Sequence, residues 1–349
     1  MRILVFFLIS FAALGLHAAE KYDLILLNGR LLDGSGNPWI YADVAIEGER
    51  IAAIGDLSDA AADRIIDAAG LYVAPGFIDT HSHGAAGLGN AKRAAAGNLL
   101  KQGVTTIFVN PDGGGATDLV AQAERFESHG TGVNFGQMVP HGSVRAKVVG
   151  REDRHATEEE MEQMRALVRE GMEAGAFGLS SGPFYAPGSF APTSELVELS
   201  KVASEFGGVY QSHIRDESDY SIGVVKAVDE VIEIAEQAEL PGIVTHIKVL
   251  GPRVWGYSAA LVHRIERARA RGIEVFADQY PYHASQTSLS AGLVPRWALD
   301  GGRSRFLERM KDPEDRARIR EDMIDNLDRR GGGARILISS FAQEPELAG

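Results

Sequence analysis

The chain has 349 residues, of which 45% are hydrophobic and 24% are charged, and these fractions are typical of a globular protein and exclude a disordered or coiled-coil one. Its 35 basic and 48 acidic side chains give a formal net charge of −13, which argues against nucleic acid as a partner. The absence of cysteine excludes disulfide bonds and thiolate ligands.

Residues 1–19 predict a cleaved export signal. Arg2 precedes an apolar run from Ile3 to Leu16, and the segment ends in the small residues Ala18 and Ala19. The run is shorter than a bilayer span requires. We therefore expect a periplasmic or secreted protein that has no membrane contact after cleavage. An uncleaved N-terminal anchor or a buried helix is the alternative interpretation.

Residues 20–73 predict a small antiparallel sheet. Apolar segments over 22–27, 42–46 and 51–54 are separated by turn signals, among them Asn28-Gly29. Such sheets rarely stand alone, so we expect this segment to accompany a larger domain.

Residues 74–349 predict an α/β domain. Short apolar runs alternate with helical segments at intervals of about 30 residues, which is the period of a βα unit. The seven runs begin near Val73, Gly103, Val133, Ala176, Gly208, Gly242 and Gly272. A (β/α)8 TIM-type barrel fits this pattern best, and a doubly wound sheet is the alternative. A further strand-like run covers 334–341, after which the chain ends.

Histidines gather at the predicted carboxyl ends of these strands, where barrels place their active sites. Six of the ten are found there: His81, His83, His141, His213, His246 and His283. His81 and His83 alternate along one strand, so both rings can reach one ion. Asp112 lies in the turn after the second strand. Imidazoles with a carboxylate suit a zinc-like divalent ion; the alternatives are hydrogen-bonded interior histidines and a turn-forming Asp112.

The segment Val73-Ala-Pro-Gly-Phe-Ile-Asp79-Thr-His81-Ser-His83 resembles the opening motif of the amidohydrolase superfamily. Within it, the chain is similar to the N-acyl-D-amino-acid deacylase (D-aminoacylase) family from residue 22 to about 310. The motifs that carry this resemblance are Gly103-Val-Thr-Thr106, His141-Gly-Ser-Val-Arg145, Gly178-Leu-Ser-Ser-Gly182 with Phe184-Tyr185, Ser212-His213-Ile-Arg-Asp216-Glu217, Thr245-His246-Ile-Lys248 and Asp278-Gln-Tyr-Pro-Tyr282.

The resemblance implies a fold and an activity. Residues 20–73 would be the N-terminal part of a small β-sandwich domain, and residues 74–349 a metal-dependent hydrolase barrel. The activity would be zinc-dependent hydrolysis of the linear amide bond in N-acyl-D-amino acids, which are small molecules, with release of a carboxylic acid and a D-amino acid.

The resemblance also implies two metal positions. His213 and His246 would hold a tight zinc ion, and His81 and His83 would form a second, weaker position. Asp112 stands where the family commonly has a cysteine ligand. Asp is itself a competent zinc ligand, so we expect it to complete the tight site.

The resemblance further implies that four residues would contact the substrate: Lys248, Tyr282, Tyr185 and Arg296. A cation and a phenol suit a free carboxylate.

The family's catalytic aspartate, at the end of strand eight, has no counterpart in this chain, and we expect the last barrel strand and the rest of the sandwich to be missing. His141 and Asp216 are then the candidates for proton transfer, and we expect the chain alone to be marginally stable and nearly inactive. Another amidohydrolase, acting on cyclic amides or dipeptides, and a non-catalytic relative are the alternative functions. The oligomeric state is open.

Overall fold

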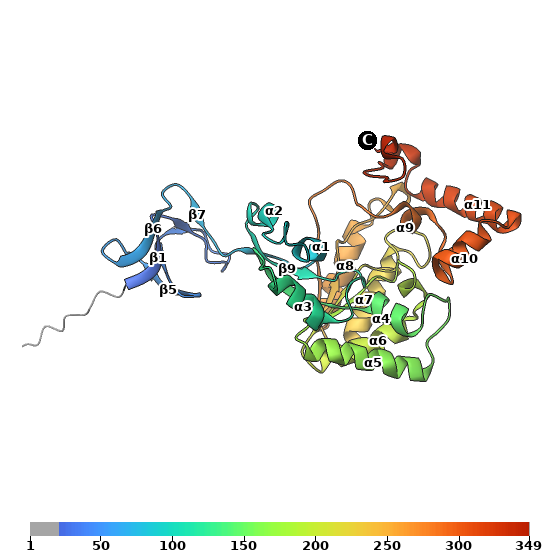
Figure 1. Cartoon of the computed structure of the whole chain (residues 1–349), viewed down its shortest axis with the longest axis horizontal. Helices are drawn as coiled ribbons and strands as arrows, with labels where there is room; N and C mark the ends of the chain where they lie inside the picture. The colour runs from blue at the N-terminus through green and yellow to red at the C-terminus, as the bar shows by residue number, and fades with distance from the viewer. Residues whose placement is uncertain (1–20, 349) are drawn as a thin grey trace, which may run out of the picture. The chain divides into compact units, whose positions relative to one another are not determined.

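The computed structural model describes residues 21–348 (Figure 1). The chain divides into two units, and the boundary along the sequence lies between Gly76 and Phe77. The export signal predicted over 1–19 lies outside the described residues. Within 21–348, no helix has both the length and the apolar character needed to cross a membrane.

The N-terminal unit is built from seven short strands. They are β1 (Lys21–Leu27), β2 (Arg30–Leu31), β3 (Ile40–Tyr41), β4 (Asp43–Glu47), β5 (Arg50–Gly55), β6 (Ala61–Asp67) and β7 (Tyr72–Val73). One sheet has the order β5-β4-β1-β6, and the other has the order β3-β2-β7. The prediction of a purely antiparallel sheet was wrong, because β6 joins β1 and β7 joins β2 in parallel.

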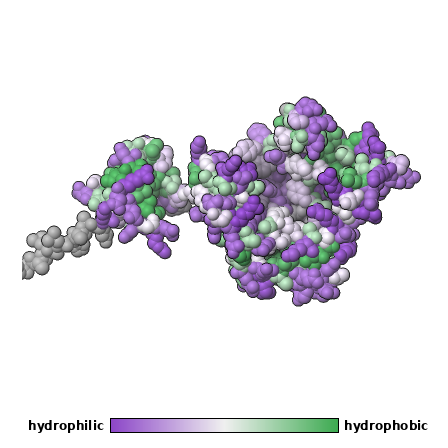
Figure 2. All heavy atoms as spheres, in the orientation of Figure 1, coloured by the Kyte–Doolittle hydropathy of each residue, from purple (hydrophilic) through white to green (hydrophobic). Residues whose placement is uncertain are grey.

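Large apolar side chains lie on the surface of this unit. Ile51, Ile65 and Tyr72 are each more than half exposed, and Figure 2 shows apolar residues gathered on the face of the unit that it presents. Isolated exposed apolar residues are ordinary, but a group of them on a small sheet indicates a surface that packs against something else.

The C-terminal unit contains parallel strands that pair in chain order. They are β8 (Phe77–Asp79), β9 (Val104–Val109), β10 (Asn134–Gln137), β11 (Val139–Pro140), β12 (Gly178–Ser181), β13 (Val209–Ser212), β14 (Gly242–Val244) and β15 (Val275–Ala277). They form the sheets β8-β9-β10 and β11-β12-β13-β14-β15. Only Met138 separates β10 from β11, so the two act as one interrupted strand. The seven predicted strands are thus all present.

The order of these strands distinguishes the two predicted architectures. Each strand pairs with the next one along the chain, and the order never reverses as it does in a doubly wound sheet. Among the described residues, β8 and β15 each have a single strand partner, so the ring is open. The prediction of an incomplete (β/α)8 barrel is confirmed.

Eleven α-helices are described in the C-terminal unit. They are α1 (Ala85–Leu88), α2 (Gly97–Leu100), α3 (Leu119–Glu127), α4 (His141–Val148), α5 (Glu158–Glu173), α6 (Thr193–Ser204), α7 (Val224–Ala238), α8 (Ser258–Ala270), α9 (Leu289–Leu293), α10 (Gly302–Arg309) and α11 (Pro313–Arg329). Helix α5 begins at a capping box, in which Thr157 and Glu160 each bond the backbone of the other. Helices α5, α6, α7 and α8 pack successively against one another (Figure 1).

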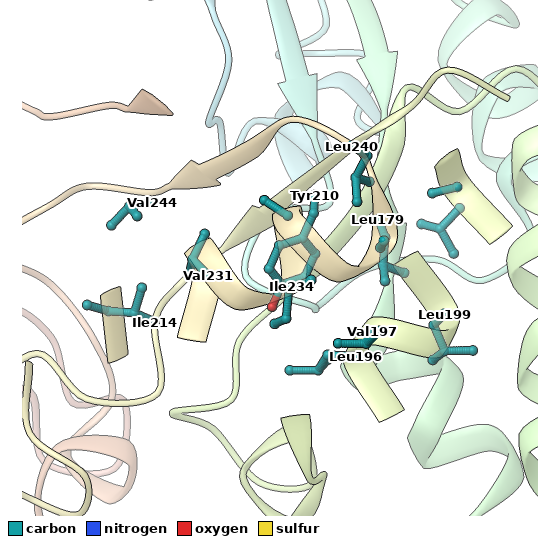
Figure 3. Packing of buried hydrophobic residues seen from close by; sticks show 14 of the residues in the cluster. Leu179, Leu196, Val197, Leu199, Tyr210, Ile214, Val231, Ile234, Leu240 and Val244 are labelled. Carbon is teal, nitrogen blue, oxygen red and sulfur yellow. The ribbon is translucent and has the colours of Figure 1, made fainter. Parts of the chain in front are cut away.

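The main core lies between these helices and strands β12 to β14 (Figure 3). Leu179 and Tyr210 from the strands meet Leu196 and Ile234 from the helices, and all four are fully buried. Burying one such side chain contributes about 1.5–3 kcal/mol. This packing provides a firm base for the loops that follow the strands, and the candidate site lies in those loops.

The strand expected over 334–341 is not formed. A 3₁₀ turn over Gly333–Arg335 is followed by irregular chain, and Leu337 is largely exposed. An apolar run becomes a strand only where a neighbouring edge pairs with it, and this run pairs with neither β8 nor β15.

Candidate metal centre

The first two candidate ligands follow β8. The pairing of β8 with β9 is extended by a hydrogen bond of 2.9 Å from the Ser82 N–H to the Phe108 carbonyl. His81 and His83 leave this extension on the same side, as the alternation predicted. The His81 side chain is almost buried, whereas that of His83 is mostly exposed.

Asp112 follows β9 and reaches both of these histidines. Its Oδ1 lies 3.4 Å from His81 Nε2, and its Oδ2 lies 3.1 Å from His83 Nε2. Its backbone has a φ of 57°, in the left-handed region that aspartate tolerates better than most residues. One carboxylate thus faces both members of the β8 pair.

His213 and His246 follow β13 and β14 and complete the cluster. His213 Nδ1 lies 3.9 Å from Asp112 Oδ1, and His246 Nε2 lies 3.6 Å from the same oxygen. The two ring nitrogens are 2.9 Å apart. The structure therefore brings together all five residues predicted as metal ligands.

The donor set fits a divalent metal. Two groups of three residues hold their ligand atoms within 4.8 Å of one another, and Asp112 belongs to both groups. A tetrahedral zinc site with bonds of about 2.0–2.1 Å separates its ligand atoms by about 3.3 Å, which is close to the distances found here. His81 Nε2 and Asp112 Oδ1 are buried without a hydrogen-bond partner, which is costly unless another ligand satisfies such atoms.

The electrostatics of the cluster favour a cation. Burial alone would raise the pKa of Asp112, but the close rings of His246, His81 and His83 hold that pKa far below its usual range. Burial lowers the pKa of His213 to about 4, so its ring is neutral. Burial would also lower the pKa of His246, but Asp112 and Glu217 raise it to about 9. The carboxylates therefore keep their charge and attract a proton or an ion.

Glu217 is a residue that the sequence did not predict for the site. It contacts the far side of the cluster, with its Oε1 3.2 Å from His246 Nδ1 and 2.5 Å from Lys248 Nζ. Burial would raise the pKa of Glu217, but His213, His246 and Lys248 lower it to about 2. A carboxylate on the second nitrogen of a histidine fixes the orientation of a ligand ring.

The cluster opens into a cavity of about 1230 Å³. The substrate candidates Lys248, Tyr185 and Tyr282 line it, although Tyr282 is 70% exposed. Tyr185 lies against the ring of His213, with centroids 4.6 Å apart. Tyr280, which was not predicted, also lines the cavity, and the centre of its ring lies 5.5 Å from Lys248 Nζ.

Arg330, which the sequence analysis missed, is a cation in the cavity wall. Its Nε donates to the Tyr220 hydroxyl at 2.7 Å and to the Gly292 carbonyl at 3.3 Å. No carboxylate among the described residues pairs with it. Arg330 lies beyond the last recognisable motif, so no signal in the sequence could have placed it here.

Three predicted residues do not line the cavity. Arg296 is not among the residues that line the cavity, because its guanidinium stacks on the Phe184 ring, with Cζ 4.0 Å from the ring centre, and its Nε donates to the Phe184 carbonyl. The ring of His141 is fully buried and bonded to Glu195. Asp216 is fully buried and accepts bonds from the backbone of 218–223.

The assignments of these residues are corrected accordingly. Arg296 is not positioned to reach a substrate carboxylate in the cavity. His141 and Asp216 are committed to bonds within the fold, and neither can reach a reacting group there.

Comparison with known proteins identifies the family to which the chain belongs. A model of the Amidohydrolase family matches residues 64–331. D-aminoacylase of Alcaligenes xylosoxydans xylosoxydans is 38% identical over 301 residues, which cover 79% of this chain and 60% of that protein. N-acyl-D-glutamate deacylase of the same organism is 37% identical, over 77% of this chain and 59% of that protein. The chain thus spans less than two thirds of the length of these relatives.

Solved structures agree with this relationship. A crystal structure of D-aminoacylase has a TM-score of 0.71 at 35% identity and covers 77% of this chain and 60% of its own. N-acyl-D-glutamate deacylase from Bordetella bronchiseptica, complexed with zinc and a phosphonate inhibitor, has a TM-score of 0.69 at 34% identity and covers 75% and 59%. D-hydantoinase, at 19% identity and a TM-score of 0.52, shares the fold. With its family model, its relatives and its cluster of histidines in agreement, this chain belongs to the Amidohydrolase family.

Proposed function

We propose that the protein is a zinc-dependent hydrolase of N-acyl-D-amino acids. The observation that carries this proposal is the cluster in which Asp112 is shared between a histidine pair from β8 and a pair from β13 and β14. D-aminoacylase, N-acyl-D-glutamate deacylase and N-acyl-D-aspartate deacylase each match more than three quarters of the chain at 33–38% identity, and an N-acyl-D-glutamate deacylase was solved with zinc.

The donor set supports two metal positions of unequal strength. The position formed by Asp112, His213 and His246 is buried, whereas that formed by Asp112, His81 and His83 includes an exposed ring. When bound, zinc supplies Lewis acidity, which activates water as a nucleophile and polarises an amide carbonyl. A study of D-aminoacylase concerns a binuclear metal centre activated by one metal and attenuated by a second, which agrees with unequal positions.

The residues around the cluster suit a carboxylate-bearing substrate. Lys248 is already paired with Glu217, so its charge is largely compensated. Arg330 has no such partner among the described residues, and its Nη groups make no hydrogen bond there. We assign the substrate carboxylate to Arg330, with Lys248 and Tyr280 on the neighbouring wall. A guanidinium binds a carboxylate through paired, charge-assisted hydrogen bonds.

The described cavity wall offers few groups that could transfer a proton. The only carboxylates in the described cavity wall are Asp112 and Glu217, and both are held by the histidine cluster. An amide nitrogen leaves only when it is protonated, and a positioned acid contributes about 10²–10⁴-fold to such a step. We therefore expect slow turnover by the 349-residue chain.

A panel of substrates tests the function. The zinc-loaded chain is incubated with N-acetyl-D-amino acids, their L-enantiomers and cyclic amides, and the released amine or carboxylate is quantified. We expect release from the D-compounds alone, and none from protein in which His213→Ala and His246→Ala are combined. Release from the cyclic amides or the L-compounds, or activity that survives the double substitution, would contradict the proposal.

We also propose that the protein is exported and processed before Ala19 or Glu20. The support is the residue pattern of 1–19 alone. N-terminal sequencing of protein from the periplasmic fraction tests this, and intact Met1 on cytoplasmic protein would refute it.

A further inference from the structure

Two buried hydroxyls end strand β12 and a buried glycine follows it, and the proposed function gives these residues no role. Ser180, Ser181 and Gly182 are all buried, and the two serine side chains have no exposed surface. A buried hydroxyl destabilises a protein unless it is hydrogen-bonded, so the partners of these groups indicate what they do.

The turn that carries Asp112 is conformationally unusual. Asn110, Asp112 and Gly113 have φ values of 63°, 57° and 71°. The left-handed region costs a non-glycine residue roughly 1–2 kcal/mol, so a turn with two such residues relaxes unless its surroundings hold it. The position of the Asp112 carboxylate depends on this turn.

The Ser180 hydroxyl spans the turn. Its Oγ donates to the Asn110 carbonyl at 2.6 Å and accepts from the Gly113 N–H at 3.3 Å. One side chain thereby bonds the residues on both sides of the Pro111-Asp112 pair. The Ser181 hydroxyl, in contrast, is bonded to the Tyr210 and Ser212 hydroxyls and does not reach the turn.

Gly182 allows the turn to approach β12 closely. A Cβ atom at Gly182 would lie 2.2 Å from the Asp112 carbonyl oxygen, far inside van der Waals contact. A Cβ atom at Gly113 would lie 2.9 Å from the Gly182 nitrogen. Any side chain at position 182 would therefore push the turn away from β12.

We propose that Ser180 and Gly182 are positioning residues for the carboxylate that the two metal positions share. Ser180 holds the backbone on either side of Asp112 in its left-handed conformation, and Gly182 leaves the space that this conformation needs. The inference rests on the proposed metal site and adds that the end of β12, which contributes no ligand, sets the affinity and geometry of that site. Outer partners of metal ligands typically change affinity by 10–100-fold.

Cobalt(II) is the probe for the test, because its visible d–d bands report the number and geometry of its ligands. The metal-free 349-residue chain is titrated with Co²⁺ as wild type, Ser180→Ala, Gly182→Ala and Ser181→Ala. Ser181→Ala is the matched control, since it removes an equally buried hydroxyl from the adjacent residue. We expect Ser180→Ala and Gly182→Ala to weaken binding by about 10–100-fold and to alter the bands, and Ser181→Ala to stay within about twofold of wild type.

A double substitution separates positioning from general damage. If Ser180 acts through Asp112, then Ser180→Ala has little further effect on Co²⁺ affinity in protein that already carries Asp112→Ala. An equal loss in both backgrounds would overturn the proposal. So would unchanged affinity and bands in Ser180→Ala, an equal loss in Ser181→Ala, or failure of Ser180→Ala to fold under conditions in which Ser181→Ala folds.

The same titration distinguishes this inference from the proposed function. If wild-type protein does not bind Co²⁺, the metal site itself is refuted. If wild type binds and Ser180→Ala binds equally well with the same bands, only the role of β12 is refuted.

Discussion

A single carboxylate connects the two halves of the histidine cluster. Asp112 Oδ1 faces His81, His213 and His246, whereas Oδ2 faces His83. Removing this side chain therefore takes a donor from both metal positions at once, while removing His83 takes one from the more exposed position only.

The first prediction follows from this sharing. We expect Asp112→Ala to weaken zinc binding more than about 100-fold, beyond the 10–100-fold range of outer partners, and His83→Ala to leave the tighter site largely intact. Competition titration with a chelating dye measures both. Asp118→Ala is the control, because this carboxylate only caps α3. Wild-type zinc affinity in Asp112→Ala would make Asp112 a turn residue and nothing more.

The second prediction concerns Arg330. A hydrogen bond to a charged group is worth about 1.5–3 kcal/mol, so Arg330→Met should weaken binding of an N-acetyl-D-amino acid by about tenfold or more. Calorimetry on the zinc-loaded chain measures this. Arg318→Met is the control, since Arg318 stacks on Trp297 and does not line the cavity.

The chemistry of the ligand sharpens this test. The corresponding N-acetyl-D-amino acid amide lacks the carboxylate, so Arg330→Met should leave its affinity unchanged. Equal losses for the acid and the amide would show that Arg330 shapes the wall and does not bind the carboxylate.

At the scale of elements, helices α4 and α6 are joined by a buried ionic group. Glu195 on α6 pairs with His141 and Arg145 on α4, and all three side chains have almost no exposed surface. Burial would raise the pKa of Glu195, but His141 and Arg145 lower it. His141 therefore stabilises the helix that follows β11, which explains why a histidine at a strand end has no place in the cavity.

The third prediction tests this pairing. Glu195→Gln leaves Arg145 buried without its counterion, so we expect a loss of about 3–5 kcal/mol in the free energy of unfolding. Glu198→Gln, which breaks an exposed pair with Lys201, should cost less than about 1 kcal/mol. Denaturant unfolding of the metal-free protein measures both.

The difference in the free energy of unfolding between wild type and Glu195→Gln should depend on pH in a defined direction. The folded pKa of Glu195 lies below its unfolded value of 4.5. Its contribution is therefore complete above pH 4.5 and is lost as the pH falls through the folded value. The difference in the free energy of unfolding between wild type and Glu195→Gln should decrease as the pH is lowered. A difference that increases would contradict the pairing.

The sequence predicted those parts of the fold and site that depend on local pattern. Short apolar runs at regular spacing predicted the barrel strands, and histidines at the ends of those runs predicted the cluster. Residues such as Glu217 and Arg330 were missed because their role comes from tertiary approach, to His246 in one case and to Tyr220 and the cavity in the other. Leu337 lies in a run with strand character, but the partner edge that decides its conformation is not a local property.

At the scale of the whole C-terminal unit, the strands form an open ring. Its curvature is already supported by one contact across the interior, in which Gln211 on β13 donates to the Thr80 carbonyl after β8 at 2.7 Å. The histidine cluster also connects distant strands across the interior of the ring, because His81 follows the first strand, β8, and His246 follows β14, the last strand but one.

A bound ion would therefore link segments that are far apart in the chain. Its presence in the site would determine how firmly these segments are held together, as well as the chemistry of the site. The fourth prediction is that zinc in thousandfold excess over its Kd raises the free energy of unfolding by about 4 kcal/mol. Amide hydrogen exchange should slow most near 80–83 and 244–247, and hardly at all in β6, which belongs to the other unit. Equal slowing of amide exchange throughout the chain would contradict this link. The order of this ring would then depend on metal supply, so the metal-free protein would exchange its amide hydrogens faster around the site until an ion bound.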